Sequence, residues 1–221
     1  LDTGLTAADL AAVMEARPDG IVLPKCEGAA HVLRIATMLE ALEPVFGIEP
    51  GQTRIIAIAT ETAASLFSLG SYRDVSPRLW GLMWGAEDLA ASLGASSNRD
   101  GAGLLEPYRL ARNLCLAGAA AAGIAAIDTV ATQIGDLEGL AREAEDARRD
   151  GFLAKAVIHP AHVDVVNAAF LPSEAEIAEA QDIVAAFANS GAQGVFQLNG
   201  RMIDMPHLRA AQRVLSMMAK P

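Results

Sequence analysis

Residues 54–62 read Arg-Ile-Ile-Ala-Ile-Ala-Thr-Glu-Thr, an apolar run that ends abruptly in polar residues. Short apolar, β-branched runs without polar residues at alternate positions are typical of strands buried on both faces of a parallel sheet. Runs of the same kind occupy residues 20–25, 79–85, 126–130 and 155–159. The sequence therefore predicts five such strands.

Segments with helical periodicity lie between these runs. In residues 136–150, acidic and basic side chains are spaced four apart, and Gly151 is placed to end the helix. Alternation of strands and helices indicates an α/β fold with a parallel sheet and right-handed crossovers. Two architectures fit this pattern, an open doubly wound sheet and a barrel.

The C-terminal part of the sequence follows a different pattern. Ser173 and Glu176 form a capping box that opens a helix ending near residue 187. Asn199-Gly200, between two short apolar runs, predicts a tight hairpin, and a last helix is expected to begin near Pro206. This segment is not another strand-helix unit.

Composition limits the possible partners and the compartment. The chain of 221 residues is 52% hydrophobic, which suits one globular domain, and its net charge of -10 argues against nucleic acid as a partner. No apolar run reaches the ~20 residues of a membrane span, so no membrane partner is expected. Cys26 and Cys115 form no disulfide framework, which suits a reducing compartment, and we expect a cytoplasmic protein.

Candidate site residues follow the predicted strands, because loops at the C-terminal ends of parallel strands face one cavity. Glu61 and Asp88 follow neighbouring strands, and two converging carboxylates suit a hard cation such as Mg2+. The alternative is that each carboxylate caps the following helix. Lys25 and His159 are candidates for binding an anionic substrate or donating a proton, and the alternative for both is a solvated charge.

Other polar and aromatic residues have structural interpretations. Trp80 and Trp84 are four residues apart in a strand-like run, so we expect both to share a face and pack in the core. His162 is expected on a helix surface. Gly101 and Gly103 indicate a flexible loop rather than a phosphate-binding motif.

Six short motifs then occur in order, each at a predicted strand or at the hairpin. They are Gly-Ile-Val-Leu-Pro-Lys (20–25), Ala-Thr-Glu-Thr-Ala (59–63), Leu-Met-Trp-Gly-Ala-Glu-Asp-Leu-Ala (82–90), Ala-Ala-Gly-Ile-Ala-Ala-Ile-Asp (121–128), Gly-Phe-Leu-Ala-Lys-Ala-Val-Ile-His-Pro (151–160) and Arg-Met-Ile-Asp-Met-Pro (201–206). Together they resemble the citrate lyase beta-subunit-like branch of the HpcH/HpaI aldolase superfamily.

This resemblance implies a TIM (β/α)8 barrel in which the five strands are the fourth to the eighth. Three strands are then expected before Leu1, together with an arginine that binds the substrate carboxylate and acidic residues near the site. Residues 1–171 form the greater part of the barrel. Residues 172–221 form a helix-hairpin-helix lid that also serves in oligomerisation.

The activity that the resemblance implies is that of a magnesium-dependent carbon-carbon lyase. Such an enzyme cleaves or forms a 3-hydroxyacyl-CoA ester, such as citryl-, malyl- or citramalyl-CoA, with an acyl-CoA and a 2-oxo acid as the products of cleavage. Glu61 and Asp88 hold Mg2+, which polarises an oxygen of the oxo acid as a Lewis acid. Backbone N–H groups from Gly85 through Ala86 and Glu87 bind the acid's carboxylate.

The resemblance also implies a catalytic role for Asp204, on a lid that reaches the active site of a neighbouring subunit in a homotrimer or hexamer. The alternative for Asp204 is a cap of the last helix. Two other functions remain open, a CoA-independent, pyruvate-releasing class II aldolase and a non-catalytic barrel subunit. The Met-Ile-Asp-Met-Pro hairpin favours the CoA-dependent branch.

Overall fold

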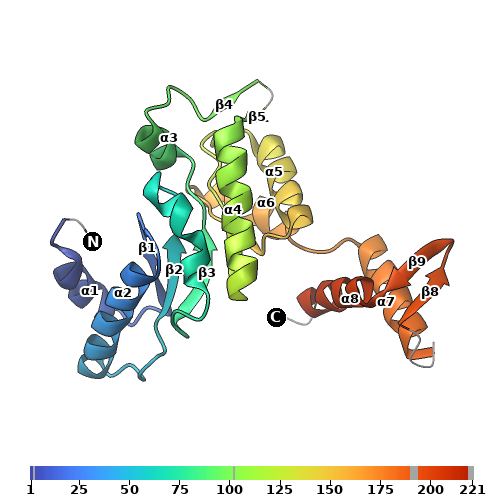
Figure 1. The fold of residues 1–221 in the computed structure, drawn as a ribbon, viewed down its shortest axis with the longest axis horizontal. Coiled ribbons are helices and arrows are strands. Elements are labelled where there is room, and N and C mark those ends of the chain that lie inside the picture. Colours follow the sequence, from blue (N-terminus) through green and yellow to red (C-terminus); the bar gives the residue numbers. More distant parts are fainter. Residues whose placement is uncertain (2, 102, 190–193, 219–221) are drawn as a thin grey trace. The chain divides into compact units, whose positions relative to one another are not determined.

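The computed structural model describes residues 1, 3–101, 103–189 and 194–218, and the chain divides into two compact units, Leu1–Val163 and Asp164–Pro221. The first unit is built on a five-stranded sheet with parallel pairing throughout (Figure 1). Its strands, in their order across the sheet, are β1 (Gly20–Leu23), β2 (Arg54–Ile58), β3 (Leu79–Met83), β6 (Ala125–Asp128) and β7 (Ala154–Lys155).

The order of the strands distinguishes between an open doubly wound sheet and a barrel, the two architectures that fit the sequence. Each of these strands pairs with the next one in the chain, and the order never reverses. A doubly wound sheet reverses its order at a switch point, which sends later helices to the opposite face. Sequential order with right-handed crossovers keeps the helices on one face, as in a barrel.

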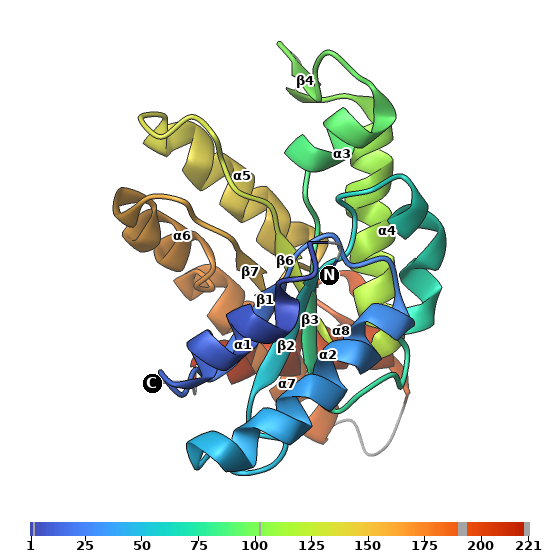
Figure 2. The same cartoon turned by 90° about the vertical axis from the view of Figure 1, so that its left-hand side faces the viewer.

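Helices and short 3-10 turns connect the strands along the sheet (Figure 2). Within this unit, α4 packs on η2, β3 and β6, and α5 packs on β7. The elements are α1 (Thr6–Met14), α2 (Ala29–Leu42), η1 (Glu43–Phe46), η2 (Ala64–Tyr72), α3 (Glu87–Leu93), α4 (Glu106–Ala122), α5 (Leu137–Asp150) and η3 (Pro160–His162). The predicted start and end of α5 are confirmed, because Asp136 accepts a hydrogen bond from the N–H of Gly139 and Gly151 adopts a left-handed conformation.

The two faces of the sheet differ in burial. Ile55 and Ala57 are fully buried beneath the helices, whereas Val22 is 51% exposed and Trp80 is 48% exposed. The prediction that the strands are buried on both faces therefore fits β6, whose four residues are all buried, but not β1 and β3, where Val22 and Trp80 are exposed. Trp84 is in the core as predicted, but Trp80 is not.

Three local predictions also need correction. The strand predicted at 155–159 covers only Ala154–Lys155, because its pairing with β6 ends at Asp128 and Lys155. The loop expected around residues 101–103 is flanked by two short antiparallel strands, β4 (Arg99–Asp100) and β5 (Gly103–Leu104). His162 is fully buried rather than on a helix surface, and its Nε2 lies 3.1 Å from the carbonyl oxygen of Ile134.

The second unit has the helix-hairpin-helix order that the sequence predicts. Its elements are α6 (Val163–Ala169), which begins at the boundary, α7 (Glu174–Asn189), β8 (Val195–Leu198), β9 (Arg201–Asp204) and α8 (Met205–Met218). Ser173 and Glu176 exchange the hydrogen bonds of a capping box at the start of α7. Asn199 and Gly200 have φ of 50° and 79°, as a two-residue turn of type I′ requires.

The second unit has a small apolar core of its own. Ala180 and Ile183 of α7 pack with Ile203 of β9 and Ala211 of α8. Across the described ranges of both units, none of the helices has the length and apolarity needed to cross a membrane.

Candidate functional site

Three residues from successive strand ends meet at the C-terminal edge of the sheet. Lys25 follows β1, Glu61 follows β2, and Asp88 lies in the first turn of α3 after β3. The backbone N–H of Lys25 donates a hydrogen bond of 2.5 Å to Oε2 of Glu61, and its ammonium lies 2.6 Å from Oδ1 of Asp88. Lys25 thus contacts both carboxylates, one through its backbone and one through its side chain.

The backbone at Lys25 is shaped for this double contact. Its φ is +48°, in the left-handed region that residues other than glycine rarely occupy. The next residue, Cys26, fixes the turn: its N–H donates to the carbonyl oxygen of Ile58, and its own carbonyl oxygen accepts from the hydroxyl of Tyr72. The unusual conformation is therefore held in place by buried neighbours, as is common at functional sites.

Glu61 lies in an environment that disfavours its negative charge. Only 9% of the residue is exposed. Burial raises the pKa of Glu61 above its usual value, and the negative charge of Asp88 adds to this effect, whereas the N–H of Lys25 opposes it. A cation between the two carboxylates would relieve both the desolvation and the repulsion.

Gly85 is required next to Glu61 for steric reasons. A Cβ atom at this position would lie 2.8 Å from Cγ of Glu61, closer than real Cβ atoms approach their neighbours. The N–H of Gly85 donates to Oγ1 of Thr60 at 2.9 Å, which fixes the backbone between β3 and α3. The glycine thereby leaves the space in which the Glu61 side chain turns toward Asp88.

This donor set fits Mg2+ better than a softer metal. Two carboxylates leave several positions of an octahedron for water and substrate oxygens, which is how Mg2+ is usually bound. Among the residues that the structure describes, no group of three or more His, Cys, Asp and Glu side chains is arranged to hold a metal. A closed cage of protein ligands is thus absent from that part of the chain.

The other predicted substrate-binding residues have mainly local contacts. The side chain of Glu87 accepts a hydrogen bond of 2.7 Å from the amide of Asn98, and Ala86 is buried directly before α3. His159 is exposed, and its Nδ1 accepts from the N–H of Ala161 at the start of η3. The structure therefore brings Lys25 and Gly85 to the two carboxylates, while the described contacts of His159 lie in its own turn.

Asp204 belongs to the second unit, where it directly precedes α8. Its Oδ1 lies 2.5 Å from Nδ1 of His207, and its N–H lies 3.3 Å from the same nitrogen. Nδ1 of His207 cannot donate to Oδ1 of Asp204 and accept from the N–H of Asp204 at the same time. The shorter contact, to Oδ1, favours the tautomer in which Nδ1 carries the proton. The position before α8 is also that of a helix cap, so both interpretations of Asp204 stay open.

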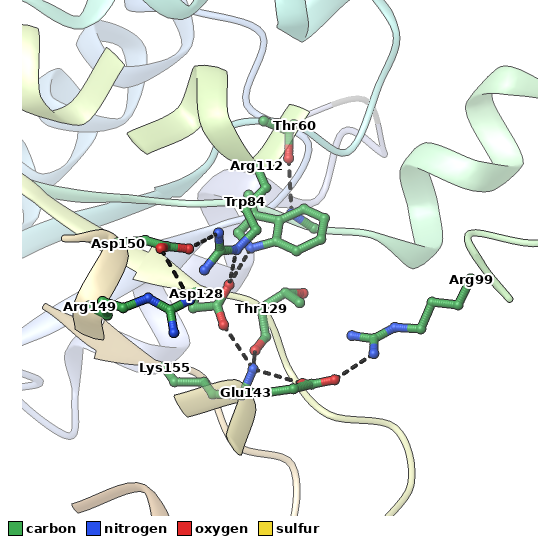
Figure 3. Close-up of polar contacts among 11 residues, drawn as sticks. Thr60, Trp84, Arg99, Arg112, Asp128, Thr129, Glu143, Arg149, Asp150 and Lys155 are labelled. Carbon is green, nitrogen blue, oxygen red and sulfur yellow. Dashed lines mark hydrogen bonds and ion pairs between the residues drawn. The ribbon is translucent and has the colours of Figure 1, made fainter. Parts of the chain in front are cut away.

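A second cluster of charged residues, not predicted from the sequence, lies beside this site. Asp128 at the end of β6 is 4% exposed, and its carboxylate accepts from the indole of Trp84 at 2.6 Å and from Nζ of Lys155 at 2.9 Å (Figure 3). Arg112 of α4 lies 3.3 Å from the same carboxylate. The sequence signal for this cluster is an Asp and a Lys inside apolar runs, because buried charges require partners.

The cluster borders a cavity of about 350 Å³ at the ends of β6 and β7. The charged side chains around it form ion pairs with one another. Arg99 pairs with Glu143, which also contacts Lys155, and Arg112 pairs with Asp150. The cavity is therefore lined by charged side chains of both signs, five basic and four acidic, that are held in ion pairs.

Comparison with known proteins adds family information to this geometry. A family model described as HpcH/HpaI aldolase/citrate lyase matches residues 1–160, and one described as C-C bond lyase of the TIM-barrel fold matches residues 108–219. Citrate lyase subunit beta of Leuconostoc mesenteroides subsp. cremoris is 36% identical over 219 residues, which cover 98% of this chain and 71% of that protein. A (3S)-malyl-CoA thioesterase of Cereibacter sphaeroides is 34% identical over 222 residues, covering 98% of this chain and 70% of that one.

A solved structure supports the same relationship. Protein CitE of Mycobacterium tuberculosis, in complex with magnesium, acetoacetate and coenzyme A, superposes with a TM-score of 0.73 at 33% identity. The alignment covers 91% of this chain and 69% of that protein.

Proposed function

Since the chain belongs to the HpcH/HpaI aldolase/citrate lyase family and is a carbon-carbon lyase, we propose that it cleaves or forms a 3-hydroxyacyl-CoA ester with the help of Mg2+. The observation that carries the proposal is the convergence of Glu61 and Asp88 from neighbouring strand ends. The relatives act on citrate, malyl-CoA and citramalyl-CoA according to their names, which supports this substrate class. The products of cleavage are an acyl-CoA and a 2-oxo acid.

Glu61 and Asp88 are the residues that would hold the cation. When bound, Mg2+ supplies Lewis acidity to an oxygen of the oxo acid unit. The backbone at Lys25 keeps Glu61 oriented, and Gly85 leaves room for that side chain. If Asp88 binds the cation, the ammonium of Lys25 loses its partner in Asp88 and would pair with the carboxylate of the substrate instead.

The remaining substrate contacts are proposed with one change from the sequence interpretation. The N–H of Gly85 already donates to Thr60, so it holds the backbone rather than a ligand. We assign the substrate carboxylate to the amides of Ala86 and Glu87 and to Lys25. His159, on an exposed loop after β7, is proposed to contact the CoA portion.

Asp204 is the proposed acid. Cleavage breaks the bond between the hydroxyl-bearing carbon and the α-carbon of the thioester, so the hydroxyl loses a proton and the α-carbon gains one. A carboxylic acid on a lid can deliver that proton while the lid excludes water. His207 keeps the carboxyl group oriented through the contact between its Nδ1 and Oδ1 of Asp204. We propose that this lid acts on the neighbouring subunit of a trimer or hexamer.

The barrel itself is also part of the proposal. We infer that β1, β2, β3, β6 and β7 correspond to the fourth to eighth strands of a TIM barrel. Their sequential order supports this, as does the half-exposed apolar face of the sheet, which would line the barrel interior. Residues 1–171 would belong to the barrel and 172–221 to the lid.

The free, buried cysteines Cys26 and Cys115 agree with a cytoplasmic setting.

An assay with a panel of substrates tests the function. The protein is incubated with Mg2+ and citryl-, malyl- or citramalyl-CoA, and free 2-oxo acid is measured, with Glu61→Gln as the inactive control. Release of oxo acid from at least one thioester, lost in the control, is expected. Turnover only of free hydroxy-oxo acids would indicate the CoA-independent aldolase. Bound Mg2+ without turnover of any substrate would indicate a non-catalytic subunit.

A further inference from the structure

The cluster around Asp128 lies next to the segment that carries Asp88. Asp128 and Lys155 are register partners on β6 and β7, and the Lys155 side chain is only 1% exposed. The Lys155 ammonium also donates to the carbonyl oxygen of Thr129 at 2.8 Å. Through the indole of Trp84, the cluster therefore joins the C-terminal ends of three strands, β3, β6 and β7 (Figure 3).

Stability alone does not explain why charges are buried here. Removing an Asp and a Lys from water costs about as much as their attraction returns, so a buried pair contributes little net stability. What the pair does supply is a fixed geometry, because its hydrogen bonds hold the groups that they join. In this cluster, the hydrogen bond from the indole N–H to Asp128 fixes the orientation of the Trp84 side chain.

Trp84 connects the cluster to Glu61 through a single residue. Its indole N–H is held by Asp128, and its backbone N–H donates to the carbonyl oxygen of Ile127 at 3.4 Å. The next residue is Gly85, where a Cβ atom would lie 2.8 Å from Cγ of Glu61 and whose N–H is held by Thr60. The indole and the backbone of Trp84 are thus both held, and a shift of the Trp84 backbone would move Gly85 relative to Glu61.

We propose that Trp84 and Asp128 are positioning residues for the cation site, with Lys155 and Arg112 as the counter-charges that keep the Asp128 carboxylate in place. The proposal rests on the proposed function, because it requires Glu61 and Asp88 to hold Mg2+. Asp128 acts through the indole of Trp84, and Trp84 acts through the backbone at Gly85. Groups outside the first layer of metal ligands commonly change metal affinity by about 10- to 100-fold when they are altered.

Calorimetric titration with Mg2+ tests this on the whole protein. Asp128→Asn and Trp84→Phe should each weaken Mg2+ binding about tenfold or more. The matched control is Glu43→Gln, which alters a fully buried carboxylate that pairs with Arg78, the residue before β3, at the opposite end of the sheet. Glu43→Gln should lower the melting temperature as Asp128→Asn does, but leave Mg2+ affinity unchanged.

Fluorescence supplies a second measurement that a merely structural role would not change. The chain has two tryptophans, so Trp80→Phe leaves Trp84 as the sole tryptophan, which is excited selectively at wavelengths that tyrosine does not absorb. Its emission should change saturably with Mg2+, at the concentration that calorimetry gives, and the change should disappear in Glu61→Gln.

The outcomes separate the two proposals. Wild-type protein that binds no Mg2+ would contradict the proposed function. Wild-type binding combined with unchanged affinity in both Asp128→Asn and Trp84→Phe, or with a constant Trp84 emission, would overturn the positioning role alone. If Asp128→Asn does not fold, Trp84→Phe decides the question, because it removes the indole hydrogen bond and some buried volume but leaves the ion pairs of Asp128 intact.

Discussion

The ammonium of Lys25 lies 2.6 Å from Oδ1 of Asp88, in contact with one of the two carboxylates proposed to hold a divalent cation. The backbone N–H of the same residue holds the other carboxylate, Glu61. The positively charged side chain of Lys25 therefore lies beside the proposed Mg2+ site. Both partners of the ion pair are about half exposed, so water weakens their attraction.

Replacing Lys25 with Met should tighten Mg2+ binding and reduce turnover. The exposed pair contributes roughly 0.2–1 kcal/mol, so the dissociation constant for Mg2+ should fall by about fivefold at most. Turnover should fall because the ammonium can no longer pair with the substrate carboxylate. Calorimetry at constant pH and an oxo acid assay check the two effects, with Lys25→Arg as the control that keeps the charge. Weaker Mg2+ binding in Lys25→Met would show that the ammonium assists the cation instead.

Gly85→Ala should weaken Mg2+ binding by tenfold or more while the protein stays folded. The added Cβ would lie 2.8 Å from Cγ of Glu61, so the carboxylate must move. Overpacking of this kind costs about 1–3 kcal/mol, a loss that a stable domain tolerates. Gly135→Ala is the matched control, because a Cβ there meets no atom within 4 Å. Equal Mg2+ affinity in the two variants would mean that Glu61 does not need its present position.

The buried pair of Glu43 and Arg78 should set the stability of the protein in acid. The Arg78 guanidinium, which hydrogen-bonds to the carboxylate, lowers the pKa of Glu43 to about 2. A lowered pKa stabilises the folded state above the unfolded pKa, about 4.3, and this stabilisation is lost as pH falls toward 2. The difference in melting temperature between wild type and Glu43→Gln should therefore shrink between pH 4.5 and pH 2. A constant difference over this range would show that the pair does not titrate with folding.

Asp204→Asn separates the proposed acid from a helix cap. Asn caps helices about as well as Asp, so the melting temperature should stay near that of wild type while turnover is lost. Mg2+ binding should also be unchanged, because Asp204 is not one of the two proposed ligands. Mixed oligomers with Glu61→Gln should recover part of the activity if the lid serves a neighbouring subunit. Full turnover in Asp204→Asn would leave helix capping as the only role of Asp204.

Much of the fold was predictable from the sequence, because apolar runs and turn residues act locally. The five strands, the capping box at Ser173 and the hairpin at Asn199 all depend on a few adjacent residues. The length of β7 was not predictable in this way. It depends on where pairing with β6 stops, at Asp128 and Lys155, and not on the β-branched residues that follow.

The site was predictable in part, for a related reason. Lys25, Glu61 and Asp88 follow strands, and parallel strands bring their C-terminal ends to one edge of the sheet. The contact between Trp84 and Asp128 joins residues 44 positions apart and depends on side-chain direction, which a single sequence does not give. Trp80 was predicted to share a buried face with Trp84 because regular alternation puts residues four apart on one face. The register of β3 on β2 shifts between Leu79 and Gly81, which leaves Trp80 out of that alternation.

Calorimetric titration of the protein with Mg2+ tests the central claim most directly, by comparing wild type with Glu61→Gln and Asp88→Asn. Both substitutions keep the shape of the side chain and remove its charge. The account predicts one Mg2+ bound per chain in wild type, no measurable binding in either variant, and melting temperatures close to wild type in both. Unchanged Mg2+ affinity in the two variants would contradict the claim and leave the two carboxylates as local structural groups.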